Sequence, residues 1–267
     1  MKSTKLAKKI ESGIRKALHE FNLIPEEGKI AVALSGGKDS ITLLKMLKRI
    51  SGYGFPPFEL YALHVTGEFS CGAGLPSKFL TDICDELEVP LIVRDSTQKL
   101  ETLECYSCSR ERRALLFDAA HSVGATHIAF GHHRDDNIQT MLMNLLKKGE
   151  FAGMLAKLFM QRFNVTITRP LILIPEEDIT SYAEQEGFLR ISCRCPRGVT
   201  SMRKKVDELI DQMEHLFPHV RKNLSHAILN YGSNKAARSL IDGDENGIAC
   251  KSTGCGGLVK LQGRALV

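Results

Sequence analysis

A turn that could hold the phosphates of a nucleotide lies at Ser35-Gly36-Gly37-Lys38-Asp39-Ser40. The apolar run 29–34 before it is typical of a buried strand, and helical periodicity resumes after it. The free N–H groups at the start of that helix, the hydroxyl groups and the Lys38 ammonium would face an anion, and the Asp39 carboxylate could bind Mg²⁺. The spacing differs from the ordinary P-loop, because Val32 stands where that loop has its first glycine. A glycine turn alone would also fit an ordinary strand–helix connection.

Two cysteine pairs could hold a metal centre or do redox chemistry. Cys105 and Cys108 precede an expected helix at 109–123, and Cys193 and Cys195 follow much later. A CxxC alone fits a redox dithiol, half of a zinc site or half of an iron–sulfur site. A CxC is tight for two ligands of one tetrahedral Zn²⁺, whereas three thiolates can hold a [4Fe–4S] cluster and leave one iron open for a ligand such as sulfide. We therefore favour iron–sulfur over zinc and over persulfide-forming thiols.

Charged and imidazole groups also follow the expected strand 127–130, in Gly131-His132-His133-Arg134-Asp135-Asp136. The two carboxylates could simply cap the next helix, or one could cap it while the other binds Mg²⁺ beside the phosphates. We take Asp135, together with Asp39, as the predicted Mg²⁺ ligands.

The elements that would position these groups are strands alternating with helices, with the strands expected at 29–34, 58–65, 91–93, 127–130 and 165–169. This alternation predicts an α/β fold with a doubly wound parallel sheet and right-handed crossovers. In such sheets ligands bind at the C-terminal strand ends, so the groups after 34 and 130 should meet on one rim. Residues 147–163 are expected to form a basic connection that contains methionine. We expect an N-terminal helix in 1–24, the main domain in 25–200, C-terminal helices in 201–240 and a flexible tail in 241–267.

Composition restricts the class of protein. The 267 residues carry a formal net charge of +5 and contain no apolar run long enough to cross a bilayer. The basic N-terminus lacks the apolar segment of a secretory signal. We therefore expect a cytoplasmic protein without membrane association, whose cysteines are reduced.

Basic residues cluster around both cysteine pairs and would suit RNA phosphates. Each cluster by itself could be an ordinary solvated surface, but their position beside the cysteines favours an RNA partner. The predicted RNA-binding residues are Arg110, Arg112, Arg113, Arg134, Arg194, Arg197, Arg203, Lys204 and Lys205.

Together, the segments 35–40, 105–110 and 131–136 resemble the N-type ATP pyrophosphatases (PP-loop proteins) and, among them, the tRNA 2-thiocytidine synthetases. The resemblance implies an adenine-nucleotide α-hydrolase-like fold, dependence on ATP and Mg²⁺, and a [4Fe–4S] cluster on three cysteines. Cys105 and Cys108 match the first cysteine pair of the family. The family has a second CxxC where this chain has a CxC, and its second cysteine is the usual ligand, which favours Cys195 with Cys193 as the alternative.

The same resemblance implies roles for individual residues. Lys38 and Asp39 would be catalytic, together with the three cysteine ligands. ATP would contact the whole phosphate turn, Gly131 and Asp135, and its adenosine would lie against Ala33, Leu34, His64 and Val65.

The implied reaction replaces the C2 oxygen of cytidine 32 in tRNA by sulfur through an adenylated base. It needs a sulfur donor, for which a cysteine desulfurase is one candidate, and we expect a homodimer. Three alternatives stay open: thiolation of another tRNA base to 2-thiouridine, a PP-loop ligase or amidating enzyme, and a non-catalytic iron–sulfur or zinc RNA-binding protein. Relatives that thiolate uridines generally carry N-terminal zinc-finger cysteines, and no cysteine precedes Cys71 here, which favours the cytidine reaction.

Overall fold

A six-stranded sheet forms the centre of the protein. The computed structural model describes residues 4–26, 28–67, 77–97, 105–188 and 202–231. The strand order is β3-β2-β1-β4-β6-β5, and every neighbouring pair is parallel except β5 with β6. The predicted doubly wound fold is confirmed, with an antiparallel strand added at one edge. The strands are β1 (Lys29–Ala33), β2 (Glu59–Thr66), β3 (Leu91–Asp95), β4 (His127–Ala129), β5 (Lys157–Met160) and β6 (Val165–Thr168).

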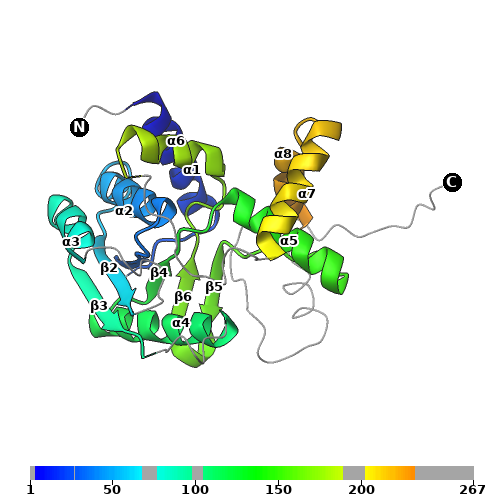
Figure 1. The fold of residues 1–267 in the computed structure, drawn as a ribbon. Helices are drawn as coiled ribbons and strands as arrows, with labels where there is room; N and C mark the ends of the chain where they lie inside the picture. Colours follow the sequence, from blue (N-terminus) through cyan, green and yellow to red (C-terminus); the bar gives the residue numbers. More distant parts are fainter. Residues whose placement is uncertain (1–3, 27, 68–76, 98–104, 189–201, 232–267) are drawn as a thin grey trace.

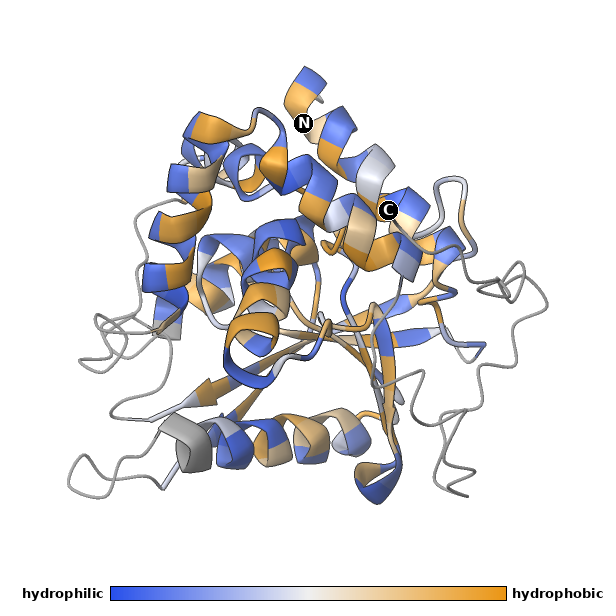
Figure 2. Cartoon of the chain, turned by 90° about the vertical axis from the view of Figure 1, so that its right-hand side faces the viewer, coloured by the Kyte–Doolittle hydropathy of each residue, from blue (hydrophilic) through white to orange (hydrophobic). Residues whose placement is uncertain are grey.

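Helices cover both faces of the sheet (Figure 1). In Figure 2, α4 lies below the sheet, and hydrophobic and hydrophilic residues alternate along it, as expected for a helix with one buried side. The helices on the opposite face bury a larger core because two of them, α1 and α2, are stacked there. One face carries α1 (Lys5–Glu20), α2 (Lys38–Ile50), α3 (Ser77–Glu86) and α6 (Glu176–Gln185), and the other carries α4 (Cys105–Ser122).

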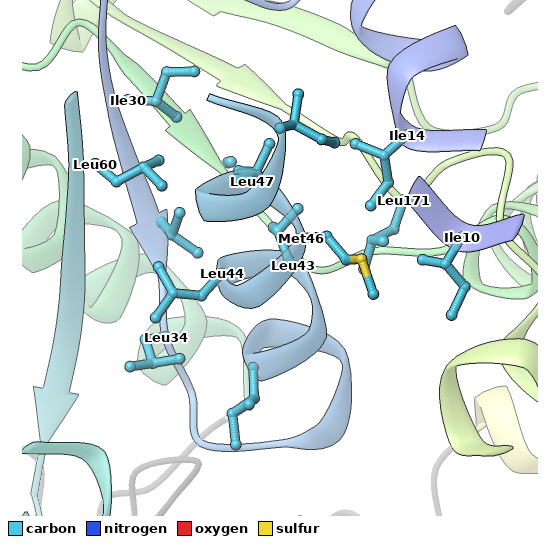
Figure 3. Close-up of a cluster of buried hydrophobic side chains, with 14 of the residues drawn as sticks. Ile10, Ile14, Ile30, Leu34, Leu43, Leu44, Met46, Leu47, Leu60 and Leu171 are labelled. Atoms are coloured by element: carbon cyan, nitrogen blue, oxygen red, sulfur yellow. The ribbon is translucent and has the colours of Figure 1, made fainter. Parts of the chain in front are cut away.

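Strand residues alternate between the two core layers because successive side chains of a strand point to opposite faces. Ile30 and Val32 of β1 join the core beneath α2, whereas Ala31 joins the core beneath α4. α2 is therefore buried on two sides, and this burial fixes the turn that precedes it. Figure 3 shows α2 between the strands and α1, with side chains of Ile10, Ile14, Leu43, Leu44, Met46 and Leu47.

A third apolar cluster joins α5 (Arg134–Lys148) to α7 (Met202–Leu216) and α8 (Val220–Tyr231), beside the sheet (Figure 1). The two C-terminal helices are thus attached through α5, the helix that follows β4. The buried members of the cluster are Ile138, Met141, Leu142, Val206, Ile210 and Ile228.

Some expectations from the sequence differ from the structure or lie outside it. The predicted connection 147–163 contains a strand that was not predicted: β5 pairs there with β6, and a four-residue edge strand gives too short a pattern to be recognised. α4 begins at Cys105 rather than at 109, so the CxxC forms its first turn. The segment with Cys193 and Cys195 and the predicted tail, 241–267, lie outside the described residues. Among the residues that are described, no helix combines the length and apolarity needed to cross a membrane.

Candidate active site

A cavity of about 220 Å³ lies where the strand order reverses, between β1 and β4. Parallel sheets bind ligands at this point because the loops after the two strands turn to opposite faces and leave a crevice. The phosphate turn 35–40 follows β1, and the loop with Gly131 follows β4. The cavity is lined by Ala33, Leu34, Ser35, Asp39, Ser40, Leu63, His64, Val65, Arg112, Leu116, Phe130, Gly131, His132 and Asp136.

The phosphate turn is held in shape by its own hydroxyl groups. Gly36 has a φ of +84°, which favours glycine, and Gly37 caps the N-terminus of α2. The Ser35 hydroxyl accepts a hydrogen bond from the Gly37 N–H at 3.3 Å and lies 3.1 Å from the Ser40 hydroxyl. The Ser40 hydroxyl donates in turn to the Gly37 carbonyl at 3.0 Å. The turn is thus preformed, and the first turn of α2 borders the cavity.

Lys38 is held between two carboxylates. Its ammonium donates to Asp39 Oδ1 at 2.9 Å and to Glu176 Oε1 at 2.8 Å. Burial alone would lower the pKa of Lys38, but the two carboxylates outweigh burial and raise that pKa above its ordinary value. Lys38 is therefore charged at neutral pH, and the third of its three N–H groups can serve a phosphate oxygen. Glu176 was not predicted from the sequence, although it opens an acidic helix start soon after the end of β6.

The loop after β4 comes against the phosphate turn. A Cβ added to Gly131 would lie 3.0 Å from the Ser40 nitrogen and 3.1 Å from the Asp39 carbonyl carbon, so a larger residue would push the two loops apart. His133 caps α5, and its Nε2 lies 3.9 Å from Asp39 Oδ1 and 3.9 Å from Glu176 Oε1. The two predicted loops therefore meet on one rim, as the parallel sheet requires.

The two carboxylates of the second loop have different surroundings. Asp136 lines the cavity and pairs with Arg203 of α7 at 3.1 Å. Asp135 is only 3% exposed, and its oxygens accept from the Glu176 N–H at 2.8 Å and from Arg221 at 3.2 Å. Burial would raise the pKa of Asp135, but the hydrogen bond from the Glu176 N–H, with other nearby positive charge, lowers it. The carboxylate of this loop that lines the cavity is thus Asp136, not the predicted Asp135.

Two histidines line the cavity as neutral rings. His64 Nδ1 is 2.8 Å from the Leu34 carbonyl oxygen, so the neutral ring donates there and keeps Nε2 as an acceptor. Burial lowers the pKa of His64, and the positive charge of Arg112 adds to this effect. Burial also lowers the pKa of His132 to about 4, with Arg169 as the next cause. Both rings can therefore form hydrogen bonds at neutral pH without adding charge to the cavity.

The first cysteine pair lies on the helix that borders the cavity from the other face of the sheet. Cys105 and Cys108 are in the first turn of α4, and positions 105, 108, 112 and 116 share one side of a helix. Arg112 and Leu116 line the cavity. Because a crossover helix runs antiparallel to the strands, the N-terminus of α4 lies toward their C-terminal ends. The backbone of the CxxC is therefore about one to two turns beyond the cavity wall.

Six of the seven described residues among those predicted to bind RNA lie near the starts of two helices, α4 and α7. Arg110 and Arg113 are exposed near the start of α4, whose Arg112 lines the cavity. A second exposed group begins α7, and its Arg203 pairs with the cavity residue Asp136. Arg134 is mostly buried and binds Asp135 at 3.4 Å, so it is not part of either exposed group. The second group consists of Arg203, Lys204 and Lys205, while Arg194 and Arg197 lie outside the described residues.

Comparisons with known proteins identify the family and the fold of the chain. Residues 5–190 match the PP-loop domain family. The chain is 32% identical over 246 residues to a tRNA-cytidine(32) 2-sulfurtransferase of Syntrophotalea carbinolica, an alignment that covers 89% of this chain and 93% of that protein. It is 34% identical over 248 residues to the protein of the same name from Xylella fastidiosa strain M12, covering 89% and 82%. Among solved structures, its fold is similar to that of the U34-tRNA thiolase NcsA from Methanococcus maripaludis, solved with its [4Fe–4S] cluster (TM-score 0.67, 23% identity, covering 83% of this chain and 77% of that one).

Proposed function

This chain belongs to the tRNA-cytidine(32) 2-sulfurtransferase family of PP-loop enzymes, and we propose that it replaces the C2 oxygen of cytidine 32 in tRNA by sulfur in an ATP-dependent reaction. One observation carries the proposal: the phosphate turn, the loop after β4 and α4, through Arg112 and Leu116, line a single cavity, and the CxxC precedes Arg112 on the same helix. An enzyme that activates a base with ATP and then delivers sulfur to it needs its ATP site and its sulfur-carrying site within reach of the same base.

The cavity suits ATP through the shape and charge of its wall. Ala33, Leu34, His64 and Val65 line one part of it and would contact the adenosine. The triphosphate would lie along the phosphate turn, where Ser35, Gly36, Gly37 and Ser40 supply N–H and hydroxyl groups and Lys38 supplies charge. Mg²⁺ would be bound by Asp39, and Asp136 replaces Asp135 as the second proposed carboxylate because it has access to the cavity.

In the first proposed step, the C2 oxygen of the cytosine attacks the α-phosphorus of ATP, and the bond to pyrophosphate breaks. Lys38 and the N-terminus of α2 offset the charge that develops on the leaving pyrophosphate. In the second step a sulfide sulfur adds at C2, and the C2–O bond breaks, so the oxygen leaves as part of AMP. The contribution of the chain is to orient the reactants and stabilise charge.

The cysteines are the proposed ligands of the cluster. Their thiolates are the soft ligands that iron–sulfur clusters use, and a position at a helix N-terminus favours the thiolate form. The proposed ligands are Cys105, Cys108 and Cys195, with Cys193 as the alternative to Cys195. When bound, a [4Fe–4S] cluster on three cysteines supplies an open iron that can hold sulfide for delivery.

The partners and the compartment are also proposals. tRNA would lie across the exposed basic residues at the starts of α4 and α7, which flank the cavity. A sulfur donor such as a cysteine desulfurase would supply the sulfide, and the reaction would take place in the cytoplasm. The proposed homodimer has support in two exposed apolar side chains where α7 ends, Leu216 and Phe217.

Nucleoside analysis after reaction tests the function. Anaerobically purified protein would be incubated with ATP, Mg²⁺, sulfide and tRNA from cells that lack it. We expect 2-thiocytidine at position 32, with AMP and pyrophosphate formed in equal amounts. A 2-thiouridine product would overturn the substrate assignment, and a colourless protein that amidates or ligates its substrate would overturn the sulfur transfer.

A further inference from the structure

A guanidinium outside the cavity connects the C-terminal helices to the nucleotide site. Arg221 of α8 lies 3.2 Å from Asp135 of α5, 3.3 Å from Asp207 and 3.1 Å from Glu214 of α7, and it also contacts Asp211. Its side chain is 17% exposed. No described residue of α8 lines the cavity, so Arg221 has no direct contact with the proposed nucleotide position. Arg221 thus pairs with three half-exposed or exposed carboxylates of α7 and with one buried carboxylate, that of Asp135.

A continuous set of hydrogen bonds leads from Arg221 to the phosphate turn. Asp135 Oδ1 accepts from Arg221, and Asp135 Oδ2 accepts from the backbone N–H of Glu176 at 2.8 Å. That N–H belongs to the first residue of α6, and the Glu176 side chain accepts from Lys38 at 2.8 Å. Asp135 Oδ1 is thus held from α8 by Arg221 and, at 3.4 Å, by its own neighbour Arg134, while Oδ2 holds the start of α6. The carboxylate predicted to bind Mg²⁺ is instead occupied by these donors.

We propose that Arg221 is a positioning residue of the nucleotide site: it fixes Asp135, which holds the start of α6, so that Glu176 keeps Lys38 in place. Only the kinetic effect expected of this role depends on the proposed function. The structural role of Arg221 does not depend on it. If Arg221 has this role, Lys38 is fully held in place only when α7 and α8 are packed against α5. α7 also carries the basic residues at 203–205. The competing explanation is that Arg221 only attaches α8 to α7 and α5, while Asp135 serves as a metal ligand.

Hydrogen exchange at the start of α6 tests the positioning without any need for activity. In Arg221→Gln, the peptide that contains the Glu176 amide should exchange roughly tenfold faster, because its acceptor Asp135 loses an anchor. Asp135→Asn should give the same increase while Arg221 keeps its three carboxylates on α7, which guards against an effect of undocked helices. The matched control is Gln139→Ala. It removes the 3.1 Å hydrogen bond from Gln139 of α5 to Asp207 of α7, in the same contact between these helices, and does not change Asp135. Wild-type exchange in Arg221→Gln, or an equal increase in Gln139→Ala, would overturn the proposal.

Kinetics separate positioning from metal binding. In Arg221→Gln we expect kcat for thiolation to fall roughly tenfold, while the KM for ATP and the Mg²⁺ concentration at half-maximal rate stay within about twofold of wild type. Combined with Glu176→Ala, the Arg221 change should cause no further loss, because both act through Lys38. A several-fold rise in the Mg²⁺ requirement of Asp135→Asn would identify Asp135 as a metal ligand and refute its assigned role. Should the wild-type protein fail to thiolate tRNA, the proposed function falls, and the exchange result still decides the role of Arg221.

Discussion

Lys38 of the phosphate turn and Glu176 of α6 are joined by a 2.8 Å hydrogen bond across 138 residues of sequence. With Asp39 at 2.9 Å, this bond uses two of the three N–H groups of the ammonium and limits the directions in which the third can point. Glu176 therefore orients the ammonium of Lys38, the residue proposed to be catalytic.

Removal of the Glu176 carboxylate should lower the rate of catalysis without weakening the binding of ATP. In Glu176→Ala, Lys38 loses a fixed partner, so we expect kcat to fall by about tenfold to a hundredfold. The affinity for ATP should be equal or higher, because a negative charge near the triphosphate is gone. Calorimetric titration of ATP and steady-state thiolation rates measure the two effects. The control is Glu177→Ala, the exposed next residue on the same helix, and an equal loss of kcat there would contradict the assignment.

Asp39 should be needed for turnover and not for folding. Asp39→Asn keeps the size and polarity of the side chain but removes the charge proposed to position Mg²⁺. We expect an unchanged melting temperature and a thiolation rate near the background. Near-normal thiolation by this variant would remove Asp39 from the mechanism.

The colour of the protein should depend on cysteines of α4 and not on Cys84. Cys105→Ser and Cys108→Ser should each lose the broad visible absorbance of an iron–sulfur cluster, because a hydroxyl is a poor ligand for iron in such clusters. Cys84→Ser is the matched control: this thiol is buried in α3, and burial raises its pKa to about 11, so it stays protonated. Retention of the absorbance in both α4 variants would place the metal elsewhere.

The neutral His132 should make stability fall in acid. In the unfolded chain His132 titrates near its ordinary value of 6.5, whereas in the folded protein its pKa is about 4. Between these values the unfolded state binds a proton that the native state does not, so the free energy of unfolding decreases as pH falls from 6.5 to 4, by at most about 3 kcal/mol. Above pH 6.5 this contribution is constant. Urea unfolding at several pH values should show a weaker pH dependence for His132→Gln than for wild type or for the exposed control His19→Gln. Identical curves for all three would show that His132 titrates normally.

The salt dependence of tRNA binding should report the position of the basic groups. Replacing Arg203 by Gln should reduce the slope of log affinity against log salt by roughly 0.7–0.9 if the side chain neutralises one RNA phosphate. Lys29→Gln is the control, because Lys29 begins β1 at the end of the sheet opposite to the cavity. Binding measured between low and moderate salt gives both slopes. A tRNA affinity that does not change with salt would contradict the placement of RNA at α7.

Much of this protein could be predicted from local sequence pattern. The strand–turn–helix at 29–50 combines an apolar run, two glycines and a helical period of apolar residues. Each of these patterns is complete within a short stretch of sequence, so it can be recognised without the tertiary structure. Parallel topology follows from alternating strands and helices, and it places the loops after β1 and β4 on one rim. These local and topological rules suffice to locate the cavity and to expect a nucleotide there.

Only the tertiary structure decided which side chains share that cavity and which support it. Asp135 and Asp136 are adjacent in sequence and chemically identical, yet one is buried beneath Arg221 and the Glu176 N–H while the other lines the cavity. Helical rotation of about 100° per residue separates them, and the packing of α7, α8 and α6 around α5 determines which side faces the cavity. Glu176 and Arg221 reach their partners over 138 and 86 residues, and no periodicity or motif within either segment carries that information.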